Sequence, residues 1–352
     1  MNLRTLALLL LIAYLASACS TDEAAAPTTQ TPPMSIDTTG PPPEPVRAVG
    51  EPLRIIVDYS PTSSDVTALM YVTQHPEADL LAVTLAGTGE SHCEAGVAST
   101  LALLAMVGRP EVPVACGQRD PVGPGNEWPE AWRDAADRLA GLDLDVSDLA
   151  VQDDSVDAPD LIASLAADAA PVIIVALGPL TNLAVAIERH DELAEVVAGV
   201  VTMGGAVDVE GNAPNDVAEW NYFIDPTAVD VVLRSGIPMT MVPLDATNAV
   251  PVTRAWFDAL AGNRTTAAAD VVHDLFEASR PFEFGFFFWD ELAAATAFDP
   301  TLVTFNERPI VIELDGAQQG RTRVDAAGAT VRIAVDADRE RFEQSLLSTL
   351  NG

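Results

Sequence analysis

Short apolar runs that alternate with stretches of helical spacing constrain the fold of this 352-residue chain most strongly. The clearest run, PVIIVAL at residues 171–177, shows no alternation of polar and apolar positions. A strand of this kind is buried on both faces, which is typical of a parallel sheet covered by helices. We expect further strands of the same sheet at residues 54–57, 80–85, 112–115, 197–203 and 239–244.

Helical patterns fill the intervals between these runs. The chain is therefore expected to be an α/β protein with an open, mostly parallel sheet and helices on both faces. Near the C-terminus, residues 310–314 and 330–335 predict a small antiparallel addition, followed by a closing helix at residues 339–350. Earlier helices are expected at residues 64–75, 96–107, 182–190 and 225–234.

The first 19 residues have the features of a secretory signal. A positive charge at Arg4 precedes an apolar run from Leu6 to Ala16. This order is typical of a cleaved signal, and the run is too short to span a membrane comfortably. Because the run ends in ASAC, Cys19 resembles the lipidated cysteine of bacterial lipoproteins. The alternative is an ordinary cleaved signal in which Cys19 is incidental.

Residues 20–50 are rich in threonine, proline and alanine. Such a composition cannot bury enough apolar surface to fold, so it predicts a disordered, extended linker. Residues 51–352 are then expected to form one large domain. These segments together predict an exported, membrane-anchored lipoprotein at the cell surface or in the periplasm, which meets the membrane only through its N-terminal lipid.

The chain is strongly acidic, with 18 basic and 52 acidic residues and a net charge of −34. A field of this sign repels phosphate backbones, so nucleic acid is excluded as a partner. The same field attracts cations, including calcium, although a generally acidic surface explains most of these charges equally well. Cys93 and Cys116 each follow a strand-like run, and the sequence leaves open whether they form a disulfide.

Polar side chains follow the first strand in the segment IIVDYSPTSSDVTA, residues 55–68. The strand breaks at Asp58, and Asp65 stands where the next helix begins. In α/β proteins, ligands bind outside the carboxyl ends of the strands. The sequence therefore predicts a ligand site at this edge of the sheet.

Two later segments carry groups suited to the same site. The segment at residues 203–226 offers Asn212, Glu219 and Asn221 for a polyhydroxylated ring. The carboxylate accepts from hydroxyls, and each amide can both donate and accept. Taken alone, these residue types more often mark turns. The aromatic run at residues 284–289 ends in Asp290, which is either a metal ligand or an N-cap, while the aromatic rings either stack on a ligand or fill the core.

Four ordered segments give the chain a resemblance to a known family. DYSPTSSD at 58–65, VALGPLTNLA at 175–184, MGGA…GN…AEWN from 203 and WDELAA at 289–294 resemble the motifs of the inosine/uridine-preferring nucleoside hydrolases. The resemblance covers residues 51–350. It implies an α/β hydrolase that cleaves the N-glycosidic bond of ribonucleosides with a bound calcium ion, and it leaves monomer and homo-oligomer open.

The resemblance also implies roles for single residues. By position, calcium would be held by the carboxylates of Asp65 and Asp290 and by the backbone carbonyl of Leu177. His92 would contact the leaving group, unless it is simply a solvated loop histidine. The substrate-binding positions implied by the resemblance are Ser64, Thr88, Met203, Asn212, Glu219, Asn221 and Trp289.

The first motif departs from the family where the chemistry is concentrated. Ser60 stands where the family has the aspartate that is both calcium ligand and general base, and Ser64 replaces an aspartate that contacts ribose. Asp58 lies on the same face of the strand as Ser60 and could substitute as the base. Calcium binding is expected to be weakened or lost with the missing carboxylates. Two functions follow: impaired ribonucleoside hydrolysis, or a non-catalytic ribonucleoside-binding lipoprotein.

Overall fold

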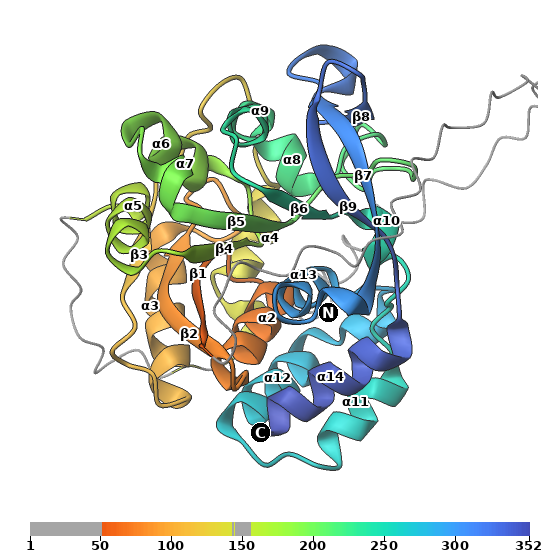
Figure 1. The fold of residues 1–352 in the computed structure, drawn as a ribbon. Helices are drawn as coiled ribbons and strands as arrows, with labels where there is room; N and C mark the ends of the chain where they lie inside the picture. Colours follow the sequence, from red (N-terminus) through yellow and green to blue (C-terminus); the bar gives the residue numbers. More distant parts are fainter. Residues whose placement is uncertain (1–50, 143, 145–155) are drawn as a thin grey trace, which may run out of the picture. The chain divides into compact units, whose positions relative to one another are not determined.

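The computed structural model describes residues 51–142, 144 and 156–352 (Figure 1). The signal segment, Cys19 and the linker lie outside the described residues. Within the described part of the chain, no helix has the length and apolar character needed to cross a membrane.

The described residues form a nine-stranded sheet in the order β3-β2-β1-β4-β5-β6-β9-β7-β8. Every strand pair from β3 to β9 in this order is parallel, whereas β7 pairs antiparallel with both β9 and β8. The predicted parallel sheet and its antiparallel C-terminal addition are confirmed. The strands are β1 (Leu53–Tyr59), β2 (Ala78–Leu85), β3 (Val114–Cys116), β4 (Val172–Ala176), β5 (Val197–Met203), β6 (Met239–Val242), β7 (Val303–Ile312), β8 (Thr322–Val324) and β9 (Ala329–Ala337).

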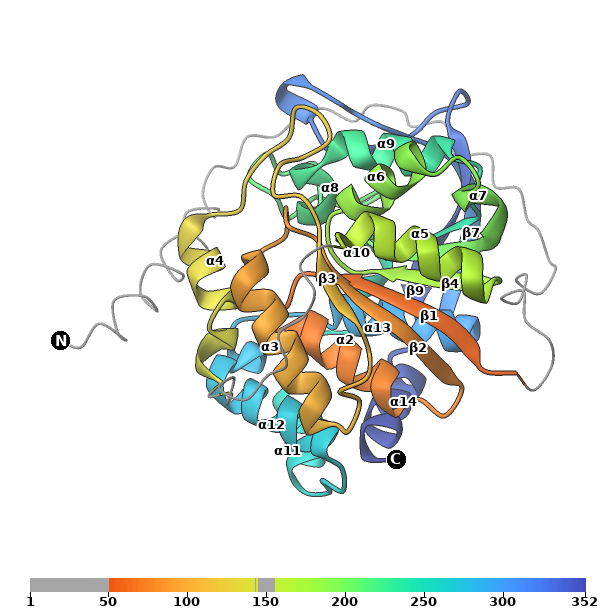
Figure 2. The same ribbon diagram turned by 90° about the vertical axis from the view of Figure 1, so that its left-hand side faces the viewer.

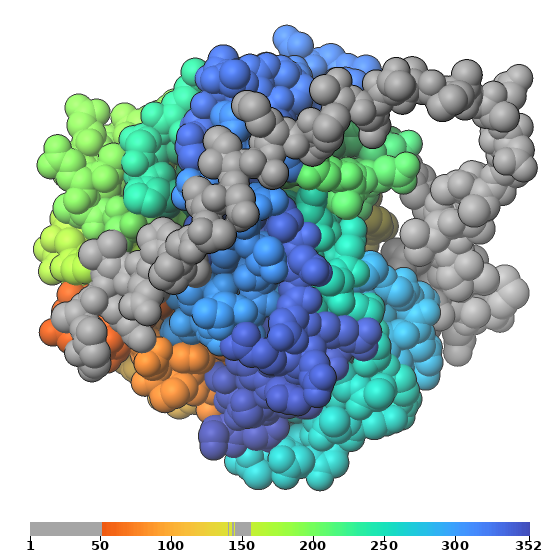
Figure 3. Space-filling model, turned by 45° about the vertical axis from the view of Figure 1, so that its right-hand side comes forward, coloured from red at the N-terminus to blue at the C-terminus, as the bar shows by residue number. Residues whose placement is uncertain are grey.

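Helices cover both faces of this sheet, as Figure 2 shows. The α-helices of the described residues are α2 (Ser63–Gln74), α3 (Cys93–Met106), α4 (Glu130–Ala136), α5 (Ala158–Ala169), α6 (Thr181–Arg189), α7 (Leu193–Val196), α8 (Trp220–Ile224), α9 (Pro226–Arg234), α10 (Leu244–Thr247), α11 (Arg254–Ala261), α12 (Ala267–Ser279), α13 (Trp289–Phe298) and α14 (Arg339–Asn351). Figure 3 shows α14 on the surface beside the segment that holds α11.

Alternate residues of β1 enter two different hydrophobic cores, which explains its continuous apolar sequence. Ile55 and Val57 face the larger core, beneath α2, α12, α13 and α14, while Ile56 faces the core beneath α5, α6 and α9. All three side chains are fully buried. A strand that is buried on both faces cannot alternate polar and apolar residues.

The order of the strands reverses between β1 and β4. From β1 the chain continues to β2 on one side, and it later returns to β4 on the other side. At such a switch point the connections leave in opposite directions and open a crevice beyond the strand ends. Ser60 directly follows β1 and Leu177 directly follows β4, so both stand at this point.

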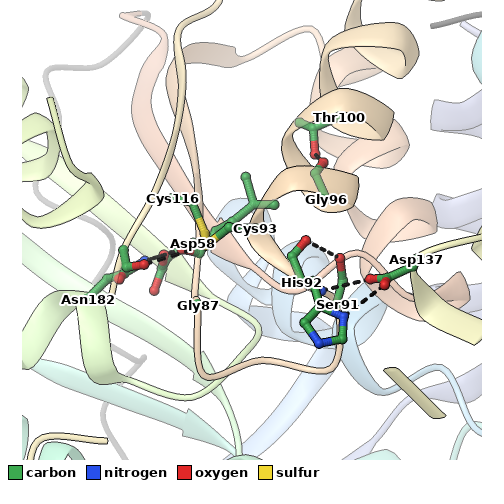
Figure 4. Close-up of a disulfide and its surroundings, with 12 residues drawn as sticks. Asp58, Gly87, Ser91, His92, Cys93, Gly96, Thr100, Cys116, Asp137 and Asn182 are labelled. Atoms are coloured by element: carbon green, nitrogen blue, oxygen red, sulfur yellow. Dashed lines mark hydrogen bonds and ion pairs between the residues drawn. A yellow bond between two sulfur atoms is a disulfide. The ribbon is translucent and has the colours of Figure 1, made fainter. Parts of the chain in front are cut away.

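A disulfide, left open by the sequence, joins Cys93 and Cys116 in the structure. The bond connects the first residue of α3 to the last residue of β3, with Cα atoms 5.7 Å apart. It therefore ties the loop that follows β2 to the neighbouring edge strand, as Figure 4 shows.

Candidate active site

The carboxylate of Asp65 is held across the loop that follows β1. The backbone N–H of Ser60 donates to Asp65 Oδ1 over 3.0 Å, and Thr62 Oγ1 donates to Oδ2 over 2.7 Å. Thr62 is also the N-cap of α2 and accepts from the Asp65 N–H. The loop and the helix start thus present Asp65 at the switch point with 3% of its surface exposed.

Ser64 joins the start of α2 to the start of α13. Its Oγ donates to Glu291 Oε2 over 2.8 Å and accepts from the backbone N–H of Asp290 over 3.2 Å. Asp290 and Glu291 are both buried in the first turn of α13. Asp290 was predicted from the sequence, whereas Glu291, the next residue in WDELAA, was not.

Asp65 lies at the centre of a cluster of acidic side chains, with Glu90, Asp290 and Glu291 around it. Burial, and after it the charges of Asp65, Glu291 and Glu219, hold the pKa of Asp290 well above its usual range. Burial raises the pKa of Glu291 to about 8 and that of Glu90 to about 8, and the charge of Asp65 adds to both. The structure therefore gathers buried carboxyl groups at the carboxyl end of β1, and burial and their mutual repulsion disfavour the ionised form of each.

Glu219 and Asn221 lie at the ends of β4 and β5. Glu219 is the N-cap of α8 and accepts from the backbone N–H groups of Asn221, Tyr222 and Gly205. Burial raises its pKa to about 7. The side-chain amide of Asn221 donates to the carbonyl oxygen of Leu177 over 2.9 Å and to that of Met203 over 3.2 Å. Asn221, predicted to bind substrate, therefore contacts the carbonyl of Leu177 that was predicted to bind metal, and Glu219 contacts Asn221. Glu219 and Asn221 together are called the ribose-clamp residues below.

Two further predicted substrate residues lie around this group. Asn212 is exposed, and its side-chain oxygen accepts from the Trp220 N–H over 3.1 Å, which closes the loop before α8. Trp289, the first residue of α13, packs against Phe286 and Phe287. Its indole N–H is buried and has no hydrogen-bond partner among the described residues.

The loop between β2 and α3, residues 86–92, makes hydrogen bonds to several neighbouring segments. Thr88 Oγ1 lies 2.8 Å from Thr181 Oγ1 at the start of α6. The His92 backbone N–H and its ring Nδ1 both lie 2.8 Å from the Asp137 carboxylate (Figure 4). The His92 ring is therefore engaged by Asp137, just past α4. Arg133 in α4 donates to the carbonyl oxygens of Gly87 and Ser91.

Asp58 is fully buried between β1, β2 and α6. Its Oδ1 accepts from Thr84 Oγ1 and from the Asn182 amide, each over 2.7 Å (Figure 4). Its Oδ2 is buried and has no partner among the described residues. Burial raises its pKa to about 7. This internal position weighs against Asp58 as the substitute base.

Comparison with known proteins identifies the family of this chain. The family described as "Inosine-uridine preferring nucleoside hydrolase" matches residues 55–344. This chain belongs to that family. Its hydrolases are generally calcium-dependent, yet no group of three or more His, Cys, Asp or Glu side chains in the described residues is placed to hold a metal ion.

Two named relatives and two solved structures show the extent of the likeness. The pyrimidine-specific ribonucleoside hydrolases RihA of Salmonella paratyphi B and Escherichia fergusonii are 32% and 31% identical to this chain, and each match covers 85% of this chain and 98% of the relative. The plant nucleoside hydrolase PpNRh1 is 27% identical with a TM-score of 0.76, covering 86% of this chain and 99% of its own. A purine-preferring ribonucleoside hydrolase from Gardnerella vaginalis is 27% identical with a TM-score of 0.74, covering 85% and 98%.

Proposed function

We propose that this chain hydrolyses the N-glycosidic bond of ribonucleosides at the switch point between β1 and β4. The observation that carries the proposal is the convergence of Asp65 and Asp290 with the ribose-clamp residues Glu219 and Asn221. These four residues come from three separate segments of the chain, and all are at most 7% exposed. A structural role alone does not require so many buried carboxylates to lie together, since each costs free energy to desolvate.

The arrangement suits the charge that develops during glycoside cleavage. As the C1′–N bond breaks, the ribosyl group becomes oxocarbenium-like and carries positive charge. Carboxylates that are already fixed around it stabilise that charge without reorganising. Glu219 and Asn221 carry hydrogen-bonding oxygens and an amide that fit ribose hydroxyls, so they would hold the ring in one orientation.

Asp65, Asp290 and the Leu177 carbonyl fit a calcium ion in the kind of donor they provide. All three donors are oxygens, and every charged group that acts on Asp290 is another carboxylate. Bound calcium would polarise and orient oxygen ligands as a Lewis acid. With only three protein donors, calcium would need oxygens from water and substrate to complete its coordination. Its affinity for the protein without substrate is therefore expected to be weak.

The alternative proposal is a ribonucleoside-binding protein without turnover. It is supported by Ser60, whose neutral hydroxyl is a poor proton acceptor at the position of the family's general base. The two proposals share the ribose clamp and differ only in whether the glycosidic bond breaks.

One assay separates them. The purified protein is incubated with inosine, uridine, cytidine, adenosine and guanosine, with calcium or with chelator, and the free base is measured. Hydrolysis predicts base release that is lost in Asp290→Ala, while calorimetric binding without release supports the alternative. No release and no binding with any of the five nucleosides would contradict both. A panel is needed because the named relatives differ between pyrimidine and purine preference.

We also infer that the protein is exported and held at the membrane by a lipid on Cys19. The apolar segment before ASAC and the proline-rich linker after it support this inference. Metabolic labelling with palmitate should mark the wild type and not Cys19→Ser. Release of an unlabelled wild-type protein into the medium would instead identify an ordinary cleaved signal.

A further inference from the structure

We propose that Glu90, in the loop between β2 and α3, is the catalytic base of this hydrolase and takes the role that Ser60 cannot perform. The inference rests on the proposed hydrolysis and goes beyond it, because it assigns the proton-accepting group to the loop after β2 instead of the loop after β1.

The first observation is the close approach of this loop to Ser60. A Cβ atom built on Gly89 would lie 2.2 Å from Ser60 Cβ and 2.9 Å from Ser60 Oγ. Real Cβ atoms do not come so close, so the loop can pass over Ser60 only with glycine at this position. The residue that follows, Glu90, is therefore adjacent in the chain to the point where the loop meets Ser60, and its carboxyl interacts electrostatically with Asp65.

The second observation is the surroundings of the Glu90 carboxylate. Two charged side chains interact electrostatically with this carboxylate: Asp65 raises its pKa and Arg133 lowers it. Asp65 in turn accepts the Ser60 N–H over 3.0 Å, so Glu90, Asp65 and Ser60 belong to one cluster. Glu90 is partly buried, and within the described part of the chain its carboxylate has no hydrogen-bond or ion-pair partner at bonding distance. It is therefore open to a water molecule.

The third observation is that the loop is fixed on both sides of Glu90, while the described residues hold no bonding partner for the Glu90 carboxylate. Thr88 is attached to α6, and His92 is attached to Asp137 by two bonds. Arg133 contacts the carbonyls of Gly87 and Ser91, and Cys93 is bonded covalently to β3. Fixed flanks keep a catalytic group in its productive position without further ordering when substrate binds.

The proposed step balances without any further reagent. Because the pKa of Glu90 is raised to about 8, the step needs the ionised form that prevails at mildly alkaline pH. One water proton then moves to the Glu90 carboxylate as the water oxygen forms a bond to ribose C1′. The C1′–N bond breaks, and its electron pair stays on the nucleobase nitrogen, which is protonated from solvent. The products are ribose and the free base, and Glu90 returns its proton to solvent before the next turnover.

The test compares Glu90→Gln with Glu94→Gln in the full-length protein. Both substitutions neutralise one glutamate, but Glu94 is exposed on the first turn of α3. With the nucleoside that wild type cleaves best, we expect kcat of Glu90→Gln to fall about 10²–10⁴-fold. The Kd for that nucleoside and the Tm should change little, and Glu94→Gln should behave as wild type. Added formate should restore part of kcat in Glu90→Ala and none in Glu90→Gln, where the amide fills the space.

The outcomes separate this proposal from the proposed function. An active wild type with equally active Glu90→Gln overturns the role of Glu90 and leaves hydrolysis standing. A fall in kcat that is matched by an equal loss of nucleoside binding or of Tm also overturns it, because Glu90 would then be a structural residue. A wild type that binds nucleosides and cleaves none overturns both proposals.

Discussion

Ser64 Oγ donates a hydrogen bond to Glu291 Oε2 over 2.8 Å, although the two residues are 227 positions apart in the sequence. The bond links the first turns of α2 and α13, whose N-termini both point at the proposed site. Through this bond, Ser64 satisfies a buried carboxylate.

Ser64→Ala should destabilise the protein, because Glu291 would lose its side-chain donor inside the protein. The expected loss is about 1–3 kcal/mol in the free energy of unfolding, measured in urea. Ser64→Asp should cost more at pH 8, since it places a second negative charge beside Glu291. The pair Ser64→Asp with Glu291→Gln should recover most of that loss; an equal loss in single and double variants would show that the two residues do not interact.

Asp58 should make stability fall as pH rises. Its pKa is about 7 in the folded chain against 3.8 for an ordinary aspartate, so the native state keeps a proton that the unfolded chain releases. Its stabilising contribution is complete below pH 4 and declines through pH 7, by up to about 4 kcal/mol. Asp58→Asn keeps an oxygen that accepts from Thr84 and Asn182. The variant should therefore gain stability relative to wild type when the pH rises from 5 to 8, measured as the difference in their free energies of unfolding. A pH-independent difference would contradict this role.

Calcium should stabilise the folded protein if Asp65 and Asp290 hold it. Saturation at one hundred times Kd would add about 2.7 kcal/mol, seen as a rise in Tm by calorimetry. Asp290→Asn should abolish the rise, and Asp168→Asn, a change at an exposed helix position, should not. Magnesium serves as the control ion, because it demands a stricter geometry than this donor set offers.

Reduction of the Cys93–Cys116 disulfide should loosen the loop that carries Glu90. The bond closes a separation of 23 residues, for which loop entropy predicts about 3 kcal/mol of stabilisation. The double change of both cysteines to serine should lower Tm and reduce kcat at a temperature where the protein is still folded. An unchanged kcat at such a temperature would show that the remaining contacts fix the loop by themselves.

The sheet could be predicted from the sequence because its strands are buried on both faces and read as unbroken apolar runs. Strand β8 was missed since it has only three residues and forms the edge of the sheet, with a buried Thr322 and an exposed Val324. Helices α5 and α12 were also missed. Both bury apolar side chains along one face, so the pattern was present in the sequence and was overlooked.

Part of the candidate site could also be predicted from the sequence, and part could not. Asp65, Glu219 and Asp290 could be predicted because each stands in a family motif. The pairing of Ser64 with Glu291 and the approach of Gly89 to Ser60 could not, because they depend on how α2, α13 and the loop after β2 meet in three dimensions. A single sequence carries no record of such contacts between distant segments.

The contact between Gly89 and Ser60 couples substitutions at the two positions. A side chain at position 89 would clash with Ser60 unless the loop moved away from it. Relatives that lack the aspartate at position 60 should therefore retain glycine at 89 followed by an acidic residue at 90. Relatives with that aspartate should be free to vary at both, and an alignment of the family would show the three positions changing together.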